Sequence, residues 1–222
     1  MWGFYFEQIV QTLPFFFKGL GMTALVSGLS LFIGTLVGFM LGIVRASRHR
    51  MLRFVIGLWV DLIRGTPFLV QLFITFFILP ELGLHLEAFP AAVIALSNLA
   101  ACFICEIVAG GILAVPGGQR EAATSSGLSA YHQFRHVVMP QAMRVILPPL
   151  VGQYVLLIKD SSVVSVIGVL DVTRVGWLTV QRIPEGIMVF GLVGLLYFLI
   201  CYPLIWLSNR LEKRLSVAAV RL

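Results

Sequence analysis

The sequence predicts an all-α integral membrane protein, built as a single transmembrane domain over residues 1–222. Hydrophobic residues make up 59% of the chain, charged residues only 12%, and the mean hydropathy is +0.98. Soluble proteins average about 25% charged residues, so this composition is typical of a chain embedded in lipid. A helix needs about 20 apolar residues to cross a bilayer, and the length therefore allows about five spans with their connections.

The first span is predicted at residues 19–44, which carry no charge and end at Arg45. Four of its glycines recur at near four-residue spacing: Gly28, Gly34, Gly38 and Gly42. They give the helix a smooth face on which another helix can pack closely. Residues 4–17 alternate aromatic and polar positions around Pro14, which favours a separate short helix in the membrane interface.

The remaining spans follow from four further apolar runs, at 54–80, 88–108, 145–170 and 187–208. The run at 54–80 contains Asp61, Arg64, Gly65 and Pro67, so we expect a kink within that span. No secretory signal is expected, because the first residues lack a basic start. Cys102 and Cys105 have the spacing of a redox pair. They lie in an apolar run without the strand-then-helix context, so we expect no disulfide framework and no metal site.

A polar segment of small residues, 116–144, separates the third and fourth predicted spans. Thr124, Ser125 and Ser126 offer helix caps, Gly127 permits a turn with a positive backbone angle, and Pro140 suits the start of a helix. The pattern predicts a helix, a tight turn and a second helix that meet a soluble partner. His132 and His136 are four residues apart, a spacing that could bind a metal, but no third ligand accompanies them. A solvated or partner-facing surface is the favoured interpretation.

Charge asymmetry predicts the orientation of the chain. Eleven basic residues fall on one side of the predicted topology: Arg45, Arg48, Arg50, Arg53, Arg120, Arg135, Arg144, Arg210, Lys213, Arg214 and Arg221. The opposite connections are acidic or mixed: Glu81, His85, Glu87, Asp171, Arg174, Arg182 and Glu185. Because Lys and Arg accumulate in short cytoplasmic loops, we expect the amino terminus outside, and the polar segment and carboxyl terminus in the cytoplasm. This topology accounts for the net charge of +6, so no nucleic-acid partner is expected.

The polar segment resembles the EAA loop of bacterial ABC importer permeases. The matching positions are Glu121, Ala122, Ala123, Gly127, Val137, Met139 and Pro140. Four further segments extend the resemblance to the polar amino-acid branch of this family, whose members transport solutes such as His, Glu, Gln and Arg. They are Asp61–Gln71, Glu106–Ile112, Pro140–Pro149 and Lys159–Ser162, with Ala109 where that branch usually has Arg.

The resemblance implies a type I ABC importer permease fold in the bacterial cytoplasmic (inner) membrane. It implies a translocation path for a polar amino acid or related small solute, delivered by a solute-binding protein. Coupling to a separate ATP-binding cassette ATPase dimer is expected through five residues: Glu121, Ala122, Ala123, Gly127 and Pro140. A second permease copy or a paralogue should complete the path.

This chain is not expected to hydrolyse ATP, because none of its three lysines sits in a phosphate-binding loop. The resemblance assigns ATP and Mg²⁺ to the partner ATPase, and we expect no cofactor in this chain. Two other classes fit less well. A secondary transporter would show internal repeats, and a membrane-embedded enzyme would need a catalytic constellation at membrane depth.

Six polar residues are candidates for the substrate path or for interactions inside the membrane: Asp61, Arg64, Thr66, Glu106, Lys159 and Asp160. Ionisable groups at that depth are costly and need partners or a wet cavity. Asp61 and Arg64 are three residues apart on one helix face, so they can pair locally or contact the substrate. Gly65 and Pro67 could unwind a turn and expose backbone groups to the path, or only kink the helix.

Overall fold

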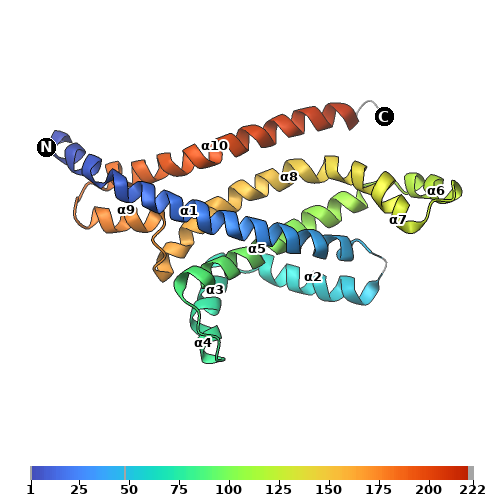
Figure 1. The fold of residues 1–222 in the computed structure, drawn as a ribbon, viewed down its shortest axis with the longest axis horizontal. Coiled ribbons are helices and arrows are strands. Elements are labelled where there is room, and N and C mark those ends of the chain that lie inside the picture. The colour runs from blue at the N-terminus through green and yellow to red at the C-terminus, as the bar shows by residue number, and fades with distance from the viewer. Residues whose placement is uncertain (1, 48, 220–222) are drawn as a thin grey trace. The chain divides into compact units, whose positions relative to one another are not determined.

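The structure is a computed structural model that describes residues 2–47 and 49–219, and these residues form helices without any strand (Figure 1). The α-helices are α1 (Trp2–Arg45), α2 (Arg50–Arg64), α3 (Phe68–Phe73), α4 (Leu79–Glu81), α5 (Ala88–Leu113), α6 (Gly117–Ser125), α7 (Ala130–Gln133), α8 (Met139–Asp160), α9 (Val172–Val180) and α10 (Gly186–Ala219). Two π-helical turns, η1 (Ile74–Ile78) and η2 (Phe134–Val138), and a 3₁₀ helix, η3 (Ser161–Ile167), complete the chain. The predicted all-α class is confirmed. Arg48 and Arg221, which entered the topology prediction, lie outside the described residues.

The chain forms two compact units whose boundaries fall within helices. Unit 1 comprises residues 1–32, 66–98 and 155–203, and unit 2 comprises residues 33–65, 99–154 and 204–222. By sequence, unit 2 contains twelve of the sixteen Lys and Arg residues and four of the ten Asp and Glu residues, whereas unit 1 contains four and six. The positive charge of the protein is therefore concentrated in unit 2.

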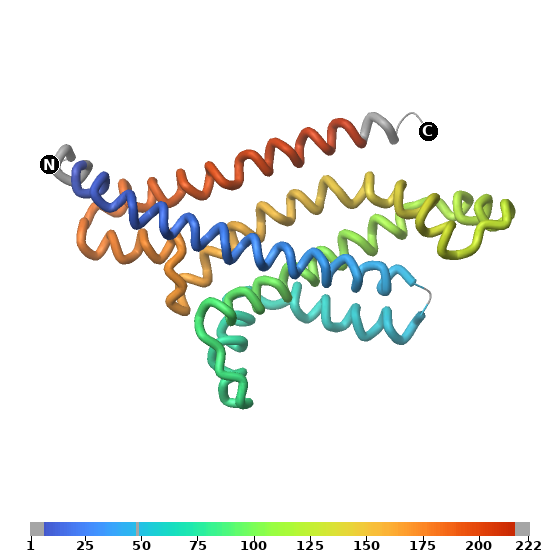
Figure 2. Tube along the Cα trace, viewed as in Figure 1, coloured from blue at the N-terminus to red at the C-terminus, as the bar shows by residue number. Residues whose placement is uncertain are grey.

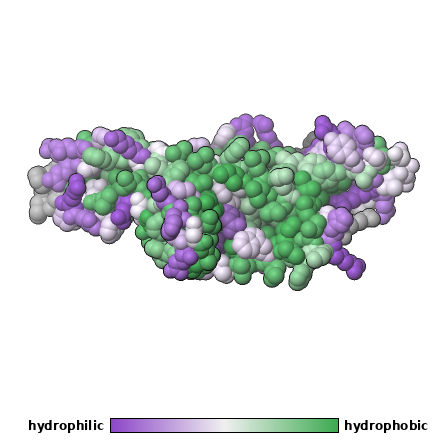
Figure 3. Space-filling view, turned by 60° about the horizontal axis from the view of Figure 1, so that its bottom comes forward, coloured by the Kyte–Doolittle hydropathy of each residue, from purple (hydrophilic) through white to green (hydrophobic). Residues whose placement is uncertain are grey.

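Four helical runs in the described part of the chain are long and apolar enough to cross a membrane. They are Glu7–Arg45, Ala88–Leu113, Ala130–Ile167 and Gly186–Leu215. The segments Arg50–Arg64 and Phe68–Glu81 make a fifth if this bent pair counts as one span. Hydrophobic side chains form much of the visible surface (Figure 3), as expected for helices that face lipid or other apolar helices.

The predicted second span, 54–80, is not one kinked helix, because the chain leaves the helix between Gly65 and Pro67. The N–H of Gly65 closes α2 by donating to the carbonyl of Asp61, and Pro67 is extended (φ −61°, ψ 138°) as the N-cap of α3. Proline has no N–H and disfavours helical geometry in the residue before it, so the helix cannot continue through this point.

Helix α1 is continuous, so the predicted separate interfacial helix at 4–17 is wrong (Figure 2). Pro14 lies inside it and removes one backbone donor. Burial offsets that loss, because Ile9 and Phe16 on either side of Pro14 belong to the main apolar cluster of unit 1, with Phe16 only 1% exposed. Their partners in the cluster are Val172, Ile183, Val189, Val193 and Leu196.

Two of the four predicted packing glycines hold α1 against α5 within unit 2. A Cβ added at Gly38 would lie 2.8 Å from the Cβ of Ile104, and one at Gly42 would lie 2.6 Å from the Cβ of Val108. The two helices run in the same direction where they touch, since the later glycine meets the later residue of α5. Gly28 is exposed with no atom within 4 Å of an added Cβ, so its predicted packing role is wrong.

The fourth and fifth predicted spans differ from the helices at their ends. The predicted fourth span, 145–170, lies in a helical run that begins at Ala130 and ends at Ile167, where Gly168 adopts φ +95°. Pro140 lies inside this run and does not begin a separate helix, because the π-helical turn η2 precedes it and continues directly into α8. The fifth helix, α10, continues past the predicted end at 208 to Ala219.

A buried carboxylate positions α9 in unit 1. Asp171 is fully buried and caps α9, because its carboxylate accepts from the N–H groups of Thr173 and Arg174 and from the hydroxyl of Tyr197. Burial raises the pKa of Asp171, and these hydrogen bonds oppose the shift. The backbone N–H of Val172, the first residue of α9, donates to the hydroxyl of Thr23 on α1. Together with the hydrogen bond from Tyr197 on α10, this connects α9 to both helices.

The glycine contact between α1 and α5 predicts a contrast between two identical substitutions. Gly42→Ala should lower the free energy of unfolding by about 1–3 kcal/mol, because the new methyl group would overlap the backbone-fixed Cβ of Val108. Gly28→Ala, the matched control, should cause no loss, because its surroundings are open and alanine is the better helix former. The measurement is the thermal unfolding midpoint in one detergent. Equal midpoints for the two variants would contradict the packing role of Gly42.

Candidate functional site

The polar segment between α5 and α8 folds as the predicted helix, tight turn and second helix (Figure 1). Helix α6 ends at Ser125 with Ser126 as its C-cap, and Gly127 follows in the left-handed region with φ +74°. The N–H of Gly127 donates to the carbonyl of Thr124, and that of Leu128 donates to the carbonyl of Ala123. These two bonds define a Schellman motif, in which glycine is the residue that adopts positive φ without strain. The prediction of a positive backbone angle at Gly127 is confirmed.

Ser126 is the C-cap residue of α6, but none of the three hydroxyl residues predicted as caps is the N-cap of the second helix. The hydroxyls of Thr124 and Ser126 donate back to the carbonyls of Arg120 and Ala122, one turn earlier in α6. Ser129 is the N-cap of α7 instead, and its hydroxyl accepts from the N–H of His132. Hydroxyl side chains bond to nearby backbone groups at either end of a helix, so composition alone did not distinguish the two ends.

Two side chains that the sequence analysis did not single out as site residues hold the loop in place. The Gln133 side-chain amide of α7 donates to the hydroxyl of Thr124 of α6 over 2.6 Å, which joins the two helices across the turn. Arg120 of α6 donates to the carbonyl of Ile112 over 2.7 Å and so caps the C-terminal end of α5. The loop is therefore connected to the last turn of α5 by a charged hydrogen bond.

The five residues expected to couple the chain to the ATPase differ in exposure. Glu121, Ala122, Gly127 and Pro140 are exposed, whereas Ala123 is buried at 6% exposure and packs inside the loop. Glu121 has no ion pair among the described residues. His132 and His136 are exposed and stacked with ring centroids 5.7 Å apart. No group of three metal-ligating residues occurs in the part of the chain that the structure describes.

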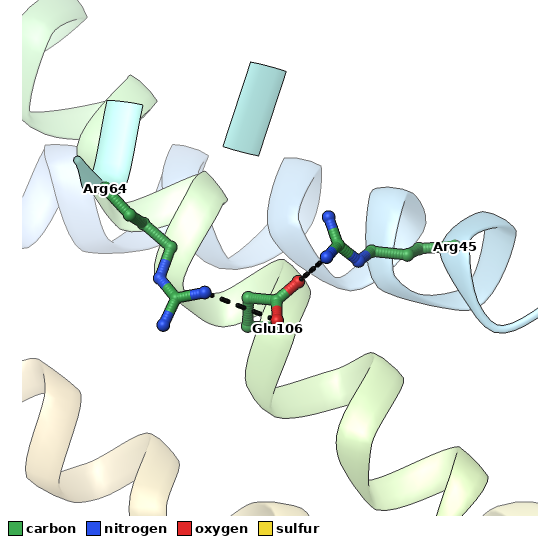
Figure 4. Close-up of polar contacts among 3 residues, drawn as sticks. All are labelled: Arg45, Arg64 and Glu106. Carbon is green, nitrogen blue, oxygen red and sulfur yellow. Dashed lines mark ion pairs between the residues drawn. The ribbon is translucent and has the colours of Figure 1, made fainter. Parts of the chain in front are cut away.

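A cluster of three charged side chains joins α1, α2 and α5 within unit 2 (Figure 4). Arg45 Nη2 lies 2.7 Å from Glu106 Oε1, and Arg64 Nη1 lies 3.3 Å from Glu106 Oε2. The Arg45 side chain is the more shielded of the two arginines, with 19% exposure against 37% for Arg64. The Arg64 guanidinium also lies over the ring of Phe103, 5.3 Å from its centroid.

Gly57 of α2 makes room for this cluster. A Cβ added there would lie 3.3 Å from Nη1 of Arg45, so the guanidinium rests against the helix where no side chain stands. One carboxylate between two guanidinium groups leaves one positive charge uncompensated within the cluster. The arrangement has no nucleophile or acid–base pair, so its chemistry is electrostatic attraction that joins three helices.

Asp61 and Arg64 do not form the local pair that their spacing allows, because Arg64 turns to Glu106 on α5. Asp61 is exposed and has no ion pair among the described residues. Thr66 lies in unit 1, where the Gln71 side chain donates to its carbonyl and to its hydroxyl, both over 3.1 Å. Lys159 is exposed and Asp160 half-buried, and the two side chains do not pair with each other.

Known proteins similar to this chain are membrane components of transport systems. Residues 34–217 match the family described as "binding-protein-dependent transport system inner membrane component". The probable amino-acid ABC transporter permease protein YckA of Bacillus subtilis (strain 168) is 36% identical over 205 residues, covering 92% of this chain and 91% of that protein. The glutamine transport system permease protein GlnP of Escherichia coli (strain K12) is 32% identical, covering 96% and 99%.

Two solved structures of ABC transporters have the same fold as this chain. The crystal structure of an amino acid ABC transporter with histidines superposes with a TM-score of 0.82 at 33% identity, covering 98% of both chains. An inward-facing structure of the MetNI methionine ABC transporter shares the fold, with a TM-score of 0.71 at 21% identity over 94% of this chain and 98% of that chain.

Apolar helices of spanning length and a polar two-helix loop define a multi-pass permease of the inner membrane. The chain belongs to the family of binding-protein-dependent transport system inner membrane components and is the permease subunit of an ABC importer, with the type I permease fold. The family is a transport component and not a catalytic one.

The ion cluster predicts a defined pattern of stability losses. Glu106→Gln should lower the free energy of unfolding by about 1–2 kcal/mol, because two neighbouring guanidinium groups lose their shared carboxylate. Combining it with Arg45→Gln should cost less than the sum of the two single losses, since the residues interact directly. Glu121→Gln, at an exposed carboxylate without an ion pair, is the control and should change stability by less than about 0.5 kcal/mol. Additive losses in thermal unfolding would disprove the coupling.

Proposed function

We propose that this permease forms the translocation path for a polar amino acid or related small solute, delivered by a solute-binding protein. Closure of a separate ATP-binding cassette ATPase dimer, which binds ATP and Mg²⁺, moves the spans through the loop of Glu121 to Pro140. A second permease copy or a paralogue completes the path, because five spans form one half of a two-fold assembly. The amino-acid substrate is supported by the relatives named for amino-acid and glutamine transport.

One observation carries the coupling role of the loop. Glu121, Ala122 and Gly127 are exposed, and α6 and α7 are held together by the Schellman turn and by the hydrogen bond from Gln133 to Thr124. A loop that is rigid within itself, anchored to α5 by Arg120 and open on its outer side, suits a partner surface that must transmit force.

The orientation rests on the distribution of charge. Unit 2 contains the loop and most of the basic residues, so we infer that unit 2 faces the cytoplasm. Helices α1 and α5 run in the same direction where they touch, so the chain must return once between them. We infer that the broken pair α2 and α3–α4 supplies that return; the resulting five crossings support an amino terminus outside and a carboxyl terminus inside.

The intramembrane residues are candidates for the path in this proposal. Asp61, Arg64 and Glu106 belong to unit 2, and Thr66, Lys159 and Asp160 belong to unit 1. Asp61 and Lys159 are the strongest of these candidates for contact outside the chain, because both are exposed ionisable side chains without an ion pair among the described residues.

Gly127→Asp should leave the permease folded while weakening its hold on the ATPase. An added Cβ meets no atom within 4 Å in this chain, so the loss arises at the partner surface and from the positive φ, which disfavours residues with a side chain. Glu121→Lys should act in the same direction but less, because an exposed charge pair contributes little. Gly118→Asp, an open glycine in the first turn of α6, is the matched control.

The measurements are co-purification of the ATPase and the stimulation of ATP hydrolysis in vesicles by the binding protein loaded with each member of a polar amino-acid panel. Wild-type values of both for Gly127→Asp would exclude the loop as the coupling element. If no member of the panel stimulates ATP hydrolysis by the wild-type complex, the proposed substrate class is rejected. The coupling role of the loop is not affected by that result.

The orientation is tested with single cysteines in a chain that lacks Cys102, Cys105 and Cys201. Cysteine at exposed Ser126 should be labelled by an impermeant thiol reagent only after the membrane is opened. Cysteine at Leu82, which is 73% exposed in the turn after α4, should be labelled from outside intact cells and serves as the positive control. Labelling of Ser126→Cys in intact cells would reverse the proposed topology.

A further inference from the structure

A groove in unit 1 runs between α1 and α9. None of the residues that line it belongs to the coupling loop or to the ion cluster of unit 2. Its volume is about 390 Å³, and most of its wall is apolar. The apolar side chains come from both helices and from the residues that precede and follow α9: Phe15, Met22, Leu170, Val175, Leu178 and Ile183. None of the segments that resemble the amino-acid permease motifs contributes to this wall.

Two cationic side chains line the same groove. Lys18 extends from α1 and Arg182 follows α9, and both are exposed. Neither has an ion pair within the described residues. Lys18 has only a cation–π contact with Phe15, at 5.9 Å from the ring centroid. The neighbouring Arg174 of α9 differs, because its guanidinium is stacked over Trp177 at 4.7 Å and it does not line the groove.

The position of Lys18 makes its lack of an anionic partner significant. It lies on α1 directly before the uncharged run 19–44, near one end of the apolar length of this helix, in a protein that belongs to an inner-membrane family. A cation at membrane depth is costly unless it reaches the interface or pairs with an anion. Since Arg182 opens into the same groove, two positive charges are available to one ligand, and apolar walls lie beside them.

We propose that this groove binds an anionic phospholipid. An acyl chain lies along the apolar wall, and the headgroup phosphate accepts hydrogen bonds from Lys18 and Arg182. Arginine binds phosphate through two parallel N–H groups, lysine acts as a point charge, and burial of the acyl chain supplies the hydrophobic contribution. The combination selects an amphiphile with one anionic end, which a free phosphate or a neutral lipid does not match.

The test compares lipid binding to the purified, delipidated transporter by native mass spectrometry. The probes are phosphatidylglycerol and phosphatidylethanolamine with identical acyl chains. The double variant Lys18→Gln with Arg182→Gln should lower the affinity for phosphatidylglycerol about tenfold or more and that for phosphatidylethanolamine by less, because the ammonium group of phosphatidylethanolamine offsets its phosphate charge, so that the preference for phosphatidylglycerol is lost. Arg174→Gln, which removes a cation of α9 outside the groove, is the matched control and should keep the wild-type preference. The single variant Lys18→Arg, which retains both positive charges of the groove, should also keep the wild-type preference for phosphatidylglycerol.

A second arm identifies the occupant in the membrane. A photoreactive amino acid at Leu178, which is 38% exposed in the groove, should cross-link to phospholipid. A cross-link to the binding protein or to another permease subunit instead would overturn the proposal. So would competition by free glycerol phosphate at the concentration of the lipid, or an unchanged preference for phosphatidylglycerol in the double variant. All three outcomes are independent of the coupling and substrate proposals.

Discussion

The close approach of α1 to α5 is the constraint on which unit 2 depends. Gly38 and Gly42 let the two backbones meet beside Ile104 and Val108, and this fixes how far one helix is displaced along the other. At that displacement Arg45, three residues past Gly42, reaches Glu106. The ion cluster is thus a consequence of steric fit. Sliding α1 along α5 by one helical turn would displace Arg45 from Glu106 by about 5 Å. The opening at Gly57 then lets α2 take its place against Arg45.

The loop and the ion cluster solve different physical problems. In the cluster, Arg45 and Arg64 share the carboxylate of Glu106, which offsets part of the cost of partly removing charged side chains from solvent. In the loop, backbone groups at two helix ends meet water, and the Schellman turn and the Ser129 cap satisfy several of them internally. As a result the loop keeps its shape while Glu121, Ala122 and Gly127 remain open to a partner.

Hydropathy and glycine chemistry predicted much of this structure, since both depend on local sequence. The apolar runs located the helices, and the Glu-Ala-Ala to Gly127 spacing predicted the turn and its positive φ. The failures share one cause, which is that neighbours in space decided the outcome. Phe16 and Ile9 keep α1 helical through Pro14, and Glu106 on a distant segment draws Arg64 from Asp61. Arg120 was assigned only to topology, because nothing nearby in sequence identifies Ile112 as its acceptor.

The prolines of α8 have a mechanical consequence. Pro148 and Pro149 remove two backbone donors from the helix, and the hydroxyl of Ser208 donates to the carbonyl of Pro148. Together with the π-helical turn η2, they place two compliant points between the loop and the rest of α8. Helix α5 has no proline beyond its first turn and receives the loop through Arg120. Helix α8 therefore has two points at which it can bend, whereas α5 continues from the loop without such an interruption.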